Sequence, residues 1–317
     1  MTTLTPPDRY AVLGHPVAHS QSPFIHAAFA QQTGQTLDYG RLDCPLDGFE
    51  ATLRGWLASA DVAADLAADL AADLAADVAA DPATGLGAVR GCNITVPFKF
   101  QVLPLARHIT PRAQLAQAAN TLRFDTDLDG SPAWTADNTD GVGLVRDLQD
   151  HAGIDLAGQR VLLIGAGGAA AGVLGPLSQA SCASISVANR TLARAAGLVQ
   201  RHRALADQHR VALHATGLDN SGSGFDLVIN SSASSLAGGP VPVSASVLRP
   251  NTLAVDLMYG PAAQPFLAWA AQHGAIGRDG LGMLVEQAAE AFLLWRGVRP
   301  STAPVLAALR ARLAAKA

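Results

Sequence analysis

Residues 161–170 read Val161-Leu162-Leu163-Ile164-Gly165-Ala166-Gly167-Gly168-Ala169-Ala170, an apolar run that leads directly into glycines and alanines. The apolar run predicts a buried strand, and the alanine-rich residues after the turn predict a helix. The turn carries the G-x-G-x-x-(G/A) pattern of dinucleotide-binding proteins in its strand-to-helix setting. Gly165 permits the tight turn, and Gly167 lets the backbone approach a pyrophosphate whose charge lies at the helix N-terminus. We therefore expect a dinucleotide to bind at Gly165, Ala166, Gly167, Gly168 and Ala169.

Later apolar runs extend this unit into a doubly wound sheet. Strands are expected at Ser184–Ala188, Phe225–Asn230 and Thr252–Tyr259, in the order and spacing of that fold. Gly277–Leu284 predicts a glycine-containing link, and Val285–Trp295 predicts the closing helix. The expected fold class is therefore α/β, with a Rossmann-like domain in the second half of the chain.

The end of the strand at Ser184–Ala188 indicates which dinucleotide is bound. An NAD site normally has an acidic residue at this point to accept a hydrogen bond from the ribose 2′-hydroxyl. This chain has Asn189, Arg190 and Thr191 instead, with Arg194 a turn later. Guanidinium groups pair well with phosphate oxygens, so we expect a 2′-phosphate and hence NADP. The alternative is that both arginines are surface residues at the start of a helix.

Residues 91–99, Gly-Cys-Asn-Ile-Thr-Val-Pro-Phe-Lys, carry the second candidate for chemistry. Polar and β-branched residues alternate over Asn93–Val96, which predicts a short strand. Pro97 must end it because proline cannot donate to a ladder. Lys99 is then expected at a strand end, where ligands of α/β sheets bind. The alternative is an ordinary surface lysine on a loop.

Two serines follow the first expected strand, Tyr10–Gly14. Pro23 suits the first turn of a helix, which makes Ser22 a candidate N-cap. Capping alone would account for Ser22, but Ser20 lies two residues earlier. Two hydroxyl groups at a helix N-terminus can hold a carboxylate, helped by the positive end of the helix dipole.

Polar residues also stand on either side of a hairpin expected at residues 122–135. Asn120 precedes it and, taken alone, is more commonly a helix cap than a ligand. Asp137–Gly141 follows it, ahead of a helix expected at Val142–Gln149. Helix capping could account for Asn138 or Thr139, but it does not account for Asp140.

Composition limits the possible partners. The 317 residues are enough for two domains, and the net charge of −4 and pI of about 6.1 give no reason to expect nucleic acid or an anionic membrane. Small molecules are the expected partners. Widely spaced Cys44, Cys92 and Cys182 fit a reducing cytoplasm better than a disulfide framework, and no cluster of ligands predicts a metal. No signal segment or membrane span is predicted, so we expect a cytoplasmic location.

A repeat at Asp61–Ala80 consists of five units of Asp-(Leu or Val)-Ala-Ala. Alanine favours a helix, whereas aspartates spaced by four repel one another. We expect an extension of the preceding helix that ends at Asp81-Pro82, and we assign it no chemistry.

Taken together, these segments resemble the shikimate dehydrogenase family, NADP-dependent enzymes of the aromatic amino acid (chorismate) pathway. The resemblance runs nearly end to end, apart from the repeat. It is carried by seven segments, Ser20–Pro23, Asn93–Lys99, Ala119–Thr121, Asp137–Gly141, Gly165–Ala169, Asn189–Thr191 and Gly280–Leu284. The chain departs from the family at Asn230-Ser231-Ser232-Ala233, where Asn-Ala-Thr is usual, and at Leu257, where a methionine is common.

The resemblance implies two α/β domains with a cleft between them that holds the active site. Residues 1–140 with 281–317 would form the substrate-binding, catalytic domain, and residues 141–280 the Rossmann-like, doubly wound NADP-binding domain. The implied reaction is the reversible, NADPH-dependent reduction of 3-dehydroshikimate to shikimate.

The resemblance also implies roles for single residues. Ser20 and Ser22 would hold the substrate carboxylate, which Tyr259 also approaches. Lys99 and Asp140 would form the catalytic pair. The residues implied to hold ring hydroxyls are Thr95, Asn120, Asp140 and Gln287, and Met258 and Gly280 are implied to bind the cofactor.

Two alternatives stay open. The chain could be a broader dehydrogenase that takes quinate or uses NAD, against which the two arginines argue. It could also be a catalytically silent NADP-binding regulator, which would have no need of Lys99 and Asp140. Either a monomer or a homodimer is compatible with the sequence.

Overall fold

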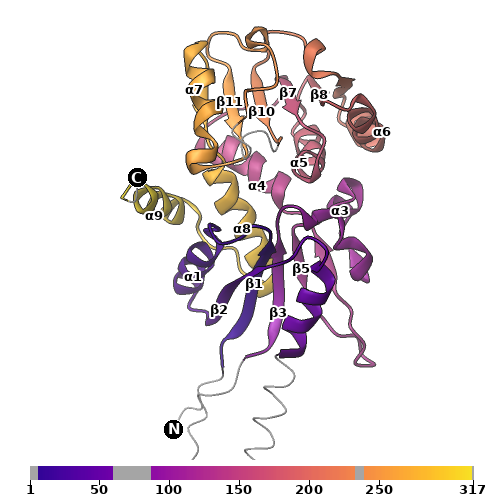
Figure 1. The fold of residues 1–317 in the computed structure, drawn as a ribbon, viewed down its shortest axis with the longest axis vertical. Helices are drawn as coiled ribbons and strands as arrows, with labels where there is room; N and C mark the ends of the chain where they lie inside the picture. The colour runs from indigo at the N-terminus through magenta and orange to yellow at the C-terminus, as the bar shows by residue number, and fades with distance from the viewer. Residues whose placement is uncertain (1–5, 60–86, 233–238, 316–317) are drawn as a thin grey trace, which may run out of the picture. The chain divides into compact units, whose positions relative to one another are not determined.

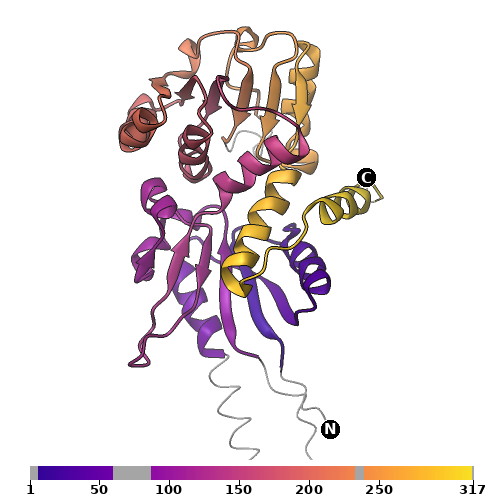
Figure 2. The ribbon, with the colours of Figure 1, turned by 180° about the vertical axis from the view of Figure 1, so that it is seen from behind.

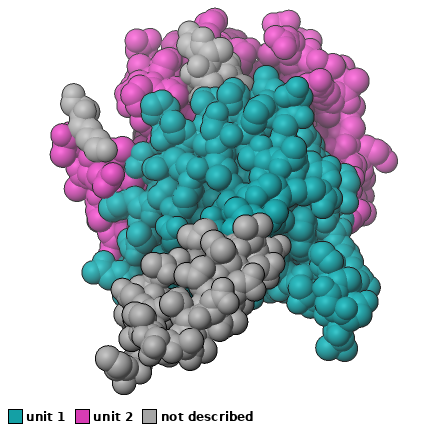
Figure 3. Space-filling view, turned by 60° about the horizontal axis from the view of Figure 1, so that its bottom comes forward, with its two compact units in different colours: residues 1–110, 119–137, 291–301 teal, residues 111–118, 138–290, 302–317 magenta. Residues whose placement is uncertain are grey.

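The structure is a computed structural model that describes residues 6–59, 87–232 and 239–315. The repeat at Asp61–Ala80 therefore lies outside the described residues. The chain divides into two compact units, residues 1–110, 119–137 and 291–301 in the first, and residues 111–118, 138–290 and 302–317 in the second (Figure 3). These boundaries follow packing alone, so the functional division expected at residues 140 and 280 stays a prediction.

A six-stranded mixed sheet forms the centre of the first unit, in the order β2-β1-β3-β5-β6-β4 (Figure 1). Its strands are β1 Asp8–Gly14, β2 Leu37–Asp43, β3 Val89–Ile94, β4 His108–Ile109, β5 Thr121–Arg123 and β6 Thr135–Asp137. β2, β1 and β3 are parallel, whereas β5 pairs antiparallel with both β3 and β6, which confirms the expected hairpin. Because Asn93 pairs with Thr121, the carboxyl end of β3 lies beside the start of β5.

Aromatic side chains pack this sheet against its helices. The helical segments are α1 Ser22–Thr33, residues 49–59, the 3-10 turns η3 Phe98–Phe100 and η4 Leu103–Leu105, and the C-terminal residues of α8 Leu281–Arg296. Phe29 of α1 meets Phe292 of α8 edge-on, with ring centroids 5.8 Å apart. Tyr10 of β1 lies 4.7 Å from Trp295 of α8 by the same measure. Burial of these rings is a main source of stability for the unit.

The second unit has a fully parallel sheet in the order β12-β11-β10-β7-β8-β9. Its strands are β7 Arg160–Ile164, β8 Ser184–Ala188, β9 Ala212–Thr216, β10 Leu227–Asn230, β11 Leu253–Asp256 and β12 Ile276–Arg278. The chain runs outward from β7 to β9 and then returns to run from β10 to β12 on the other side. This is the doubly wound order, whose switch point between β7 and β10 is where dinucleotides bind.

Helices cover both faces of the second sheet (Figures 1 and 2). The helices of this unit are α3 Pro111–Ala116, α4 Asp140–Arg146 with the π-helical turn η5 Asp147–His151, α5 Gly168–Gln179, α6 Leu192–Gln208, α7 Gln264–Gln272, the N-terminal part of α8, and α9 Ala303–Ala314, of which α5 and α6 cover one face and α7 the other. Val161 and Leu163 of β7 pack into the apolar layer that contains α4, α5 and α6. Leu162 and Ile164 pack into the opposite layer with Phe266 of α7. The apolar run is therefore buried on both faces, as expected of a central parallel strand.

Several expected bounds differ from the structure. The strand predicted at Asn93–Val96 is β3, which ends at Ile94, and Lys99 lies in η3 rather than directly at the strand end. The link predicted at Gly277–Leu284 contains β12 and the start of α8, which begins at Leu281 instead of Val285. Edge-strand pairing, which leaves little trace in composition, accounts for the missed strand.

Candidate active site

The loops that follow β1 and β3 in the first unit are in close contact. The backbone N–H of Thr95 donates to the Leu13 carbonyl at 2.8 Å, and that of His15 donates to the Val96 carbonyl at 3.0 Å. A Cβ atom at Gly14 would lie 2.3 Å from Thr95 Cγ2, so only glycine fits this crossing. The half-buried Thr95 is thereby fixed against the loop that leads to the two serines.

Ser20 and Ser22 are brought together at the start of α1. The Ser20 hydroxyl donates to Ser22 Oγ at 3.2 Å, and the Ser22 backbone N–H donates to Ser20 Oγ at 3.3 Å. The N-cap position is occupied by Gln21, so the interpretation of Ser22 as the N-cap was wrong. Arg41 holds the loop by donating to the Ser20 carbonyl at 2.6 and 3.0 Å. No sequence pattern had marked Arg41, because β2 carries no motif.

Lys99 follows β3 and Asn120 precedes β5, so the two residues lie in neighbouring segments of the first unit. The Ala119 N–H donates to the Lys99 carbonyl at 2.9 Å, and the Ile94 N–H donates to the Asn120 carbonyl at 2.8 Å. Lys99 is half-buried, whereas Asn120 is 3% exposed. Phe98 is fully buried and anchors the turn in the core. Thr95, Lys99 and Asn120 therefore lie where β3 ends and β5 begins. Thr95 also contacts the loop that leads to the two serines.

Asp140 and Gln287 are positioned within the second unit by close packing of α4 against α8. Asp140 is the first residue of α4 and is 4% exposed, and its N–H donates to Asn138 Oδ1 at 3.2 Å. The Thr139 hydroxyl donates to Gln287 Oε1 at 3.3 Å. A Cβ atom at Gly143 would lie 2.7 Å from the Gln287 backbone nitrogen. The N-cap of α4 is Thr139, whose side chain makes no cap hydrogen bond, and Asn138 accepts the first helical N–H. The role expected for Asp140 stays a prediction.

The glycine-rich turn has the geometry that a pyrophosphate requires. Gly165 adopts φ +108°, which side-chain-bearing residues avoid, and a Cβ atom there would lie 2.9 Å from Ser231 Oγ. Gly167 is the N-cap of α5, and its Cβ position is open, with no atom of the described residues within 4 Å. The first N–H groups of α5 are thus flanked by Gly167 and Gly168, which have no side chains to block a phosphate. Such a cradle fits a dinucleotide phosphate.

Two cations stand at the position where a 2′-phosphate would be expected. Arg190 and Arg194 are exposed at the start of α6, directly after β8. Within the part of the chain that the structure describes, neither guanidinium makes a hydrogen bond or an ion pair. Asn189 shapes the turn by donating from Nδ2 to the Thr191 carbonyl at 2.9 Å. The arrangement offers positive charge that carboxylates of the described residues do not neutralise.

Met258 and Gly280 are joined at the carboxyl ends of β11 and β12. The Gly280 N–H donates to the Met258 carbonyl at 2.9 Å, and a Cβ atom at Gly280 would lie 2.3 Å from the Leu257 carbonyl oxygen. The fully buried Asp256 carboxylate accepts the Met258 N–H at 2.9 Å and Asn230 Nδ2 at 3.0 Å. Sequence reasoning had missed Asp256, although a carboxylate that ends an apolar strand is a usable signal.

Tyr259 follows Met258 and lies half-buried at the start of the 3-10 turn η8 Gly260–Ala262. It lies in the second unit with Asp140 and Gln287, whereas the other substrate candidates lie in the first.

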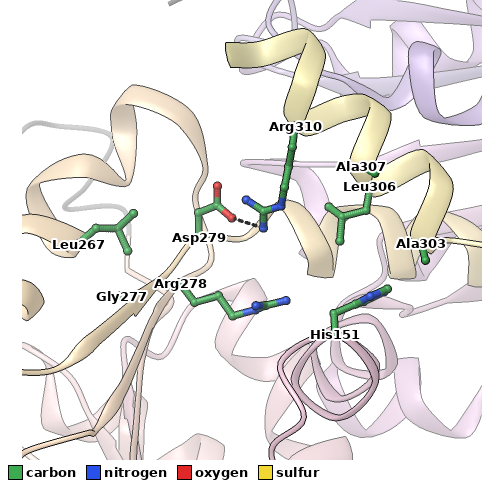
Figure 4. Close-up of a pocket in the computed structure, with 9 residues that line it drawn as sticks. All are labelled: His151, Leu267, Gly277, Arg278, Asp279, Ala303, Leu306, Ala307 and Arg310. Atoms are coloured by element: carbon green, nitrogen blue, oxygen red, sulfur yellow. Dashed lines mark hydrogen bonds and ion pairs between the residues drawn. The ribbon is translucent and has the colours of Figure 1, made fainter.

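A separate pocket of about 550 Å³ lies in the second unit (Figure 4). Its polar lining side chains are His151, Arg278, Asp279 and Arg310, and none of the expected site residues lines it. Arg310 pairs with Asp279 at 3.1 Å and His151 contacts Glu286 at 2.8 Å, so these groups already have partners. Among the described residues there is no cluster of three metal-ligating side chains and no helix long and apolar enough to cross a membrane.

Three models of one known family match successive parts of the chain. The model described as shikimate dehydrogenase substrate binding domain matches residues 12–63 and 66–122, shikimate / quinate 5-dehydrogenase matches 147–238, and shikimate 5'-dehydrogenase C-terminal domain matches 280–310. The NADP(+) shikimate dehydrogenase of Methylibium petroleiphilum is 60% identical over 304 residues, which cover 96% of this chain and 94% of the relative. The chain belongs to the shikimate dehydrogenase family.

Solved structures agree with this family and fold. The shikimate 5-dehydrogenase of Thermus thermophilus in complex with shikimate is 30% identical, with a TM-score of 0.72 over 97% of this chain and 99% of that one. The Ael1 enzyme of Pseudomonas putida is 39% identical, with a TM-score of 0.76 over 95% and 98% of the two chains. The expected family, its two-domain α/β fold and its oxidoreductase class are thereby confirmed.

Proposed function

We propose that this shikimate dehydrogenase family member catalyses the reversible reduction of 3-dehydroshikimate to shikimate with NADPH, as a step of aromatic amino acid (chorismate) biosynthesis. The observation that carries the proposal is the 60% identity, over 96% of the chain, to an NADP(+) shikimate dehydrogenase. The cradle at Gly165 and Gly167 and the two exposed arginines support the same cofactor.

Lys99 and Asp140 are the catalytic pair of this proposal. When bound, the reduced nicotinamide supplies a hydride to the carbonyl carbon. The Lys99 ammonium group stabilises the developing alkoxide and donates the proton to it, and in the reverse direction its amine accepts that proton. The Asp140 carboxylate holds the ammonium charge and the substrate hydroxyl in place.

Other side chains bind the substrate. Ser20 and Ser22 donate to its carboxylate at the positive end of α1, with Tyr259 approaching the same group. The remaining substrate residues, Thr95, Asn120 and Gln287, bind ring hydroxyls. A cyclohexene acid with several hydroxyl groups requires several donors and acceptors, because each buried polar group needs a partner.

The cofactor is held by residues of the second unit. When a dinucleotide is bound, Gly165, Ala166, Gly167, Gly168 and Ala169 at the start of α5 would hold its pyrophosphate. Asn189, Arg190, Thr191 and Arg194 would hold the 2′-phosphate of the adenosine, and Met258 and Gly280 would contact the nicotinamide. Residues 1–140 with 281–317 thus serve substrate binding and catalysis, and residues 141–280 serve cofactor binding.

We also propose that the protein is cytoplasmic and is either a monomer or a homodimer. Its partners are small molecules alone. Cys44, Cys92 and Cys182 are buried and free, and burial raises the pKa of the Cys182 thiol to about 11. Protonated, buried thiols suit a reducing compartment.

A spectrophotometric assay on the purified full-length chain tests the function. We expect the near-ultraviolet absorbance of NADPH to fall on addition of 3-dehydroshikimate, and NADP with shikimate to reverse the change. Parallel assays with NADH and with quinate should give much lower kcat/KM. Tight NADPH binding without turnover of either acid would favour a silent regulator, and efficient NAD-dependent oxidation of quinate would favour the broader dehydrogenase.

A further inference from the structure

A buried chain of hydrogen bonds in the first unit includes Asn120. Tyr39 of β2 donates its hydroxyl proton to Asn93 Oδ1 at 2.6 Å. Asn93 Nδ2 donates to Thr121 Oγ1 at 3.0 Å, and the Thr121 hydroxyl donates to Asn120 Oδ1 at 3.0 Å. All four side chains are at most 8% exposed. None of these links joins residues of a single sequence motif, except that Thr121 follows Asn120 directly.

The Asn120 backbone carbonyl fixes the direction of the hydrogen bonds in this network. The Asn120 carbonyl oxygen lies 3.2 Å from Asn93 Nδ2. If the Asn93 amide were turned over, two oxygens that can only accept would face each other, so the nitrogen must point this way. Thr121 Oγ1 therefore accepts from Asn93 and has its single proton left for Asn120. Asn120 Oδ1 is thus the accepting side of its amide, and Nδ2, which has only donors, is turned toward other partners.

The surroundings keep these groups from rearranging. The Tyr39 ring stacks on His26 with centroids 4.3 Å apart and planes at 7°. Thr121 and His26 are fully buried, so water cannot replace a broken link. In such a site each hydrogen bond is stronger than at the surface, and an unmade one costs more.

We propose that Tyr39, Asn93 and Thr121 are positioning residues that hold the Asn120 amide with Nδ2 toward the substrate, so that the enzyme binds a ring oxygen acting as an acceptor. A hydroxyl bound in this way keeps its own proton for a second partner. The inference rests on the substrate role proposed above for Asn120, which the experiment checks separately.

The experiment compares Thr121→Val, which removes the hydroxyl and keeps the shape, with Thr121→Ser, which keeps the hydroxyl. Steady-state kinetics of shikimate oxidation are measured on the full-length enzyme. We expect Thr121→Val to lower kcat/KM for shikimate roughly tenfold, the effect of one ordinary hydrogen bond, with KM for NADP within about twofold of wild type. Thr121→Ser should restore most of the loss. Tyr39→Phe, which keeps the stacked ring, should give a smaller loss in the same direction and serves if Thr121→Val fails to fold.

Repeating Thr121→Val in an Asn120→Ala background separates positioning from general damage. If Thr121 acts through the Asn120 amide, the second substitution adds no further loss to Asn120→Ala. A full additional tenfold loss, or normal kinetics of Thr121→Val and Tyr39→Phe alone, would overturn the inference while Asn120 keeps its role. Normal shikimate kinetics of Asn120→Ala would instead refute the proposed substrate role of Asn120, and the inference with it.

Discussion

Arg278 and Asp147 form a two-pronged ion pair inside the second unit, with Arg278 Nε 2.9 Å from Asp147 Oδ2 and a second bond from Nη2 to Oδ1. The carboxylate is fully buried and the guanidinium is 17% exposed. Hydrogen bonding to Asp147 raises the pKa of Arg278 above its ordinary value. A Cβ atom at Gly282 would lie 1.6 Å from Asp147 Oδ1, which places the carboxylate against the first turn of α8. The pair therefore fixes η5, β12 and α8 to one another, and α8 carries Gln287.

Removing one partner of this pair should destabilise the protein strongly. We expect Arg278→Met to lower the free energy of unfolding by about 3 kcal/mol, because it leaves a buried carboxylate without its counter-ion. Arg278→Met combined with Asp147→Asn should recover part of that loss. Arg310→Met is the matched control, since Arg310 is 44% exposed and its pair with Asp279 should contribute less than about 1 kcal/mol. Urea unfolding at pH 7 measures all three, and equal losses for Arg278→Met and Arg310→Met would contradict this account.

Substitution of Lys99 tests the catalytic assignment. Lys99→Ala should lower kcat at least about a hundredfold with a modest change in KM, because a general acid acts mainly on the chemical step. Lys99→Arg keeps the charge but has no proton to release near neutral pH, so it should be almost as slow. Both variants should retain the wild-type melting temperature and NADPH affinity. Near-normal turnover in Lys99→Ala would remove Lys99 from the mechanism.

Substitution of Arg190 tests the choice of cofactor. Arg190→Ala should raise KM for NADPH about tenfold or more and leave KM for NADH nearly unchanged, since only NADPH carries the 2′-phosphate. Arg203→Ala, an exposed arginine later on the same helix, is the control and should change neither value. An equal increase for both cofactors would show that Arg190 does not contact the 2′-phosphate.

Local sequence patterns predicted the centre of each unit and failed at the edges. The turn from β7 into α5 was predictable because an apolar run, glycines at required positions and an alanine-rich helix all lie within about a dozen residues. β12 was not, because Ile276 and Gly277 are exposed and only pairing with β11 makes them a strand. The repeat at Asp61–Ala80 lies outside the described residues, so its expected helix stays a prediction.

The candidate site shows the same division. Ser20, Thr95, Asn120 and the glycine-rich turn were predicted because each lies in a short motif. In the structure Thr95 follows β3, Asn120 precedes β5, and Ser20 and the glycine-rich turn lie at the starts of helices. Partners such as Tyr39 were missed because their bonds join residues far apart in sequence, 54 positions in the case of Tyr39 and Asn93. The catalytic pairing of Lys99 with Asp140 stays a prediction, which kinetics must decide.

Burial of His26 predicts a loss of stability in mild acid. Desolvation lowers the pKa of His26 to about 3, with the Asn93 side chain opposing the shift, whereas the unfolded chain has a histidine pKa of about 6.5. Below pH 6.5 the His26 ring therefore binds a proton in the unfolded state but not in the folded state. The free energy of unfolding falls as the pH drops toward 3. From pH 7 to pH 5 this group should remove about 2 kcal/mol from the free energy of unfolding. His26→Gln, although less stable at pH 7, should lose about 2 kcal/mol less than wild type over that interval in urea unfolding. Parallel pH curves for the two proteins would show that His26 is protonated in the folded state or exposed to water.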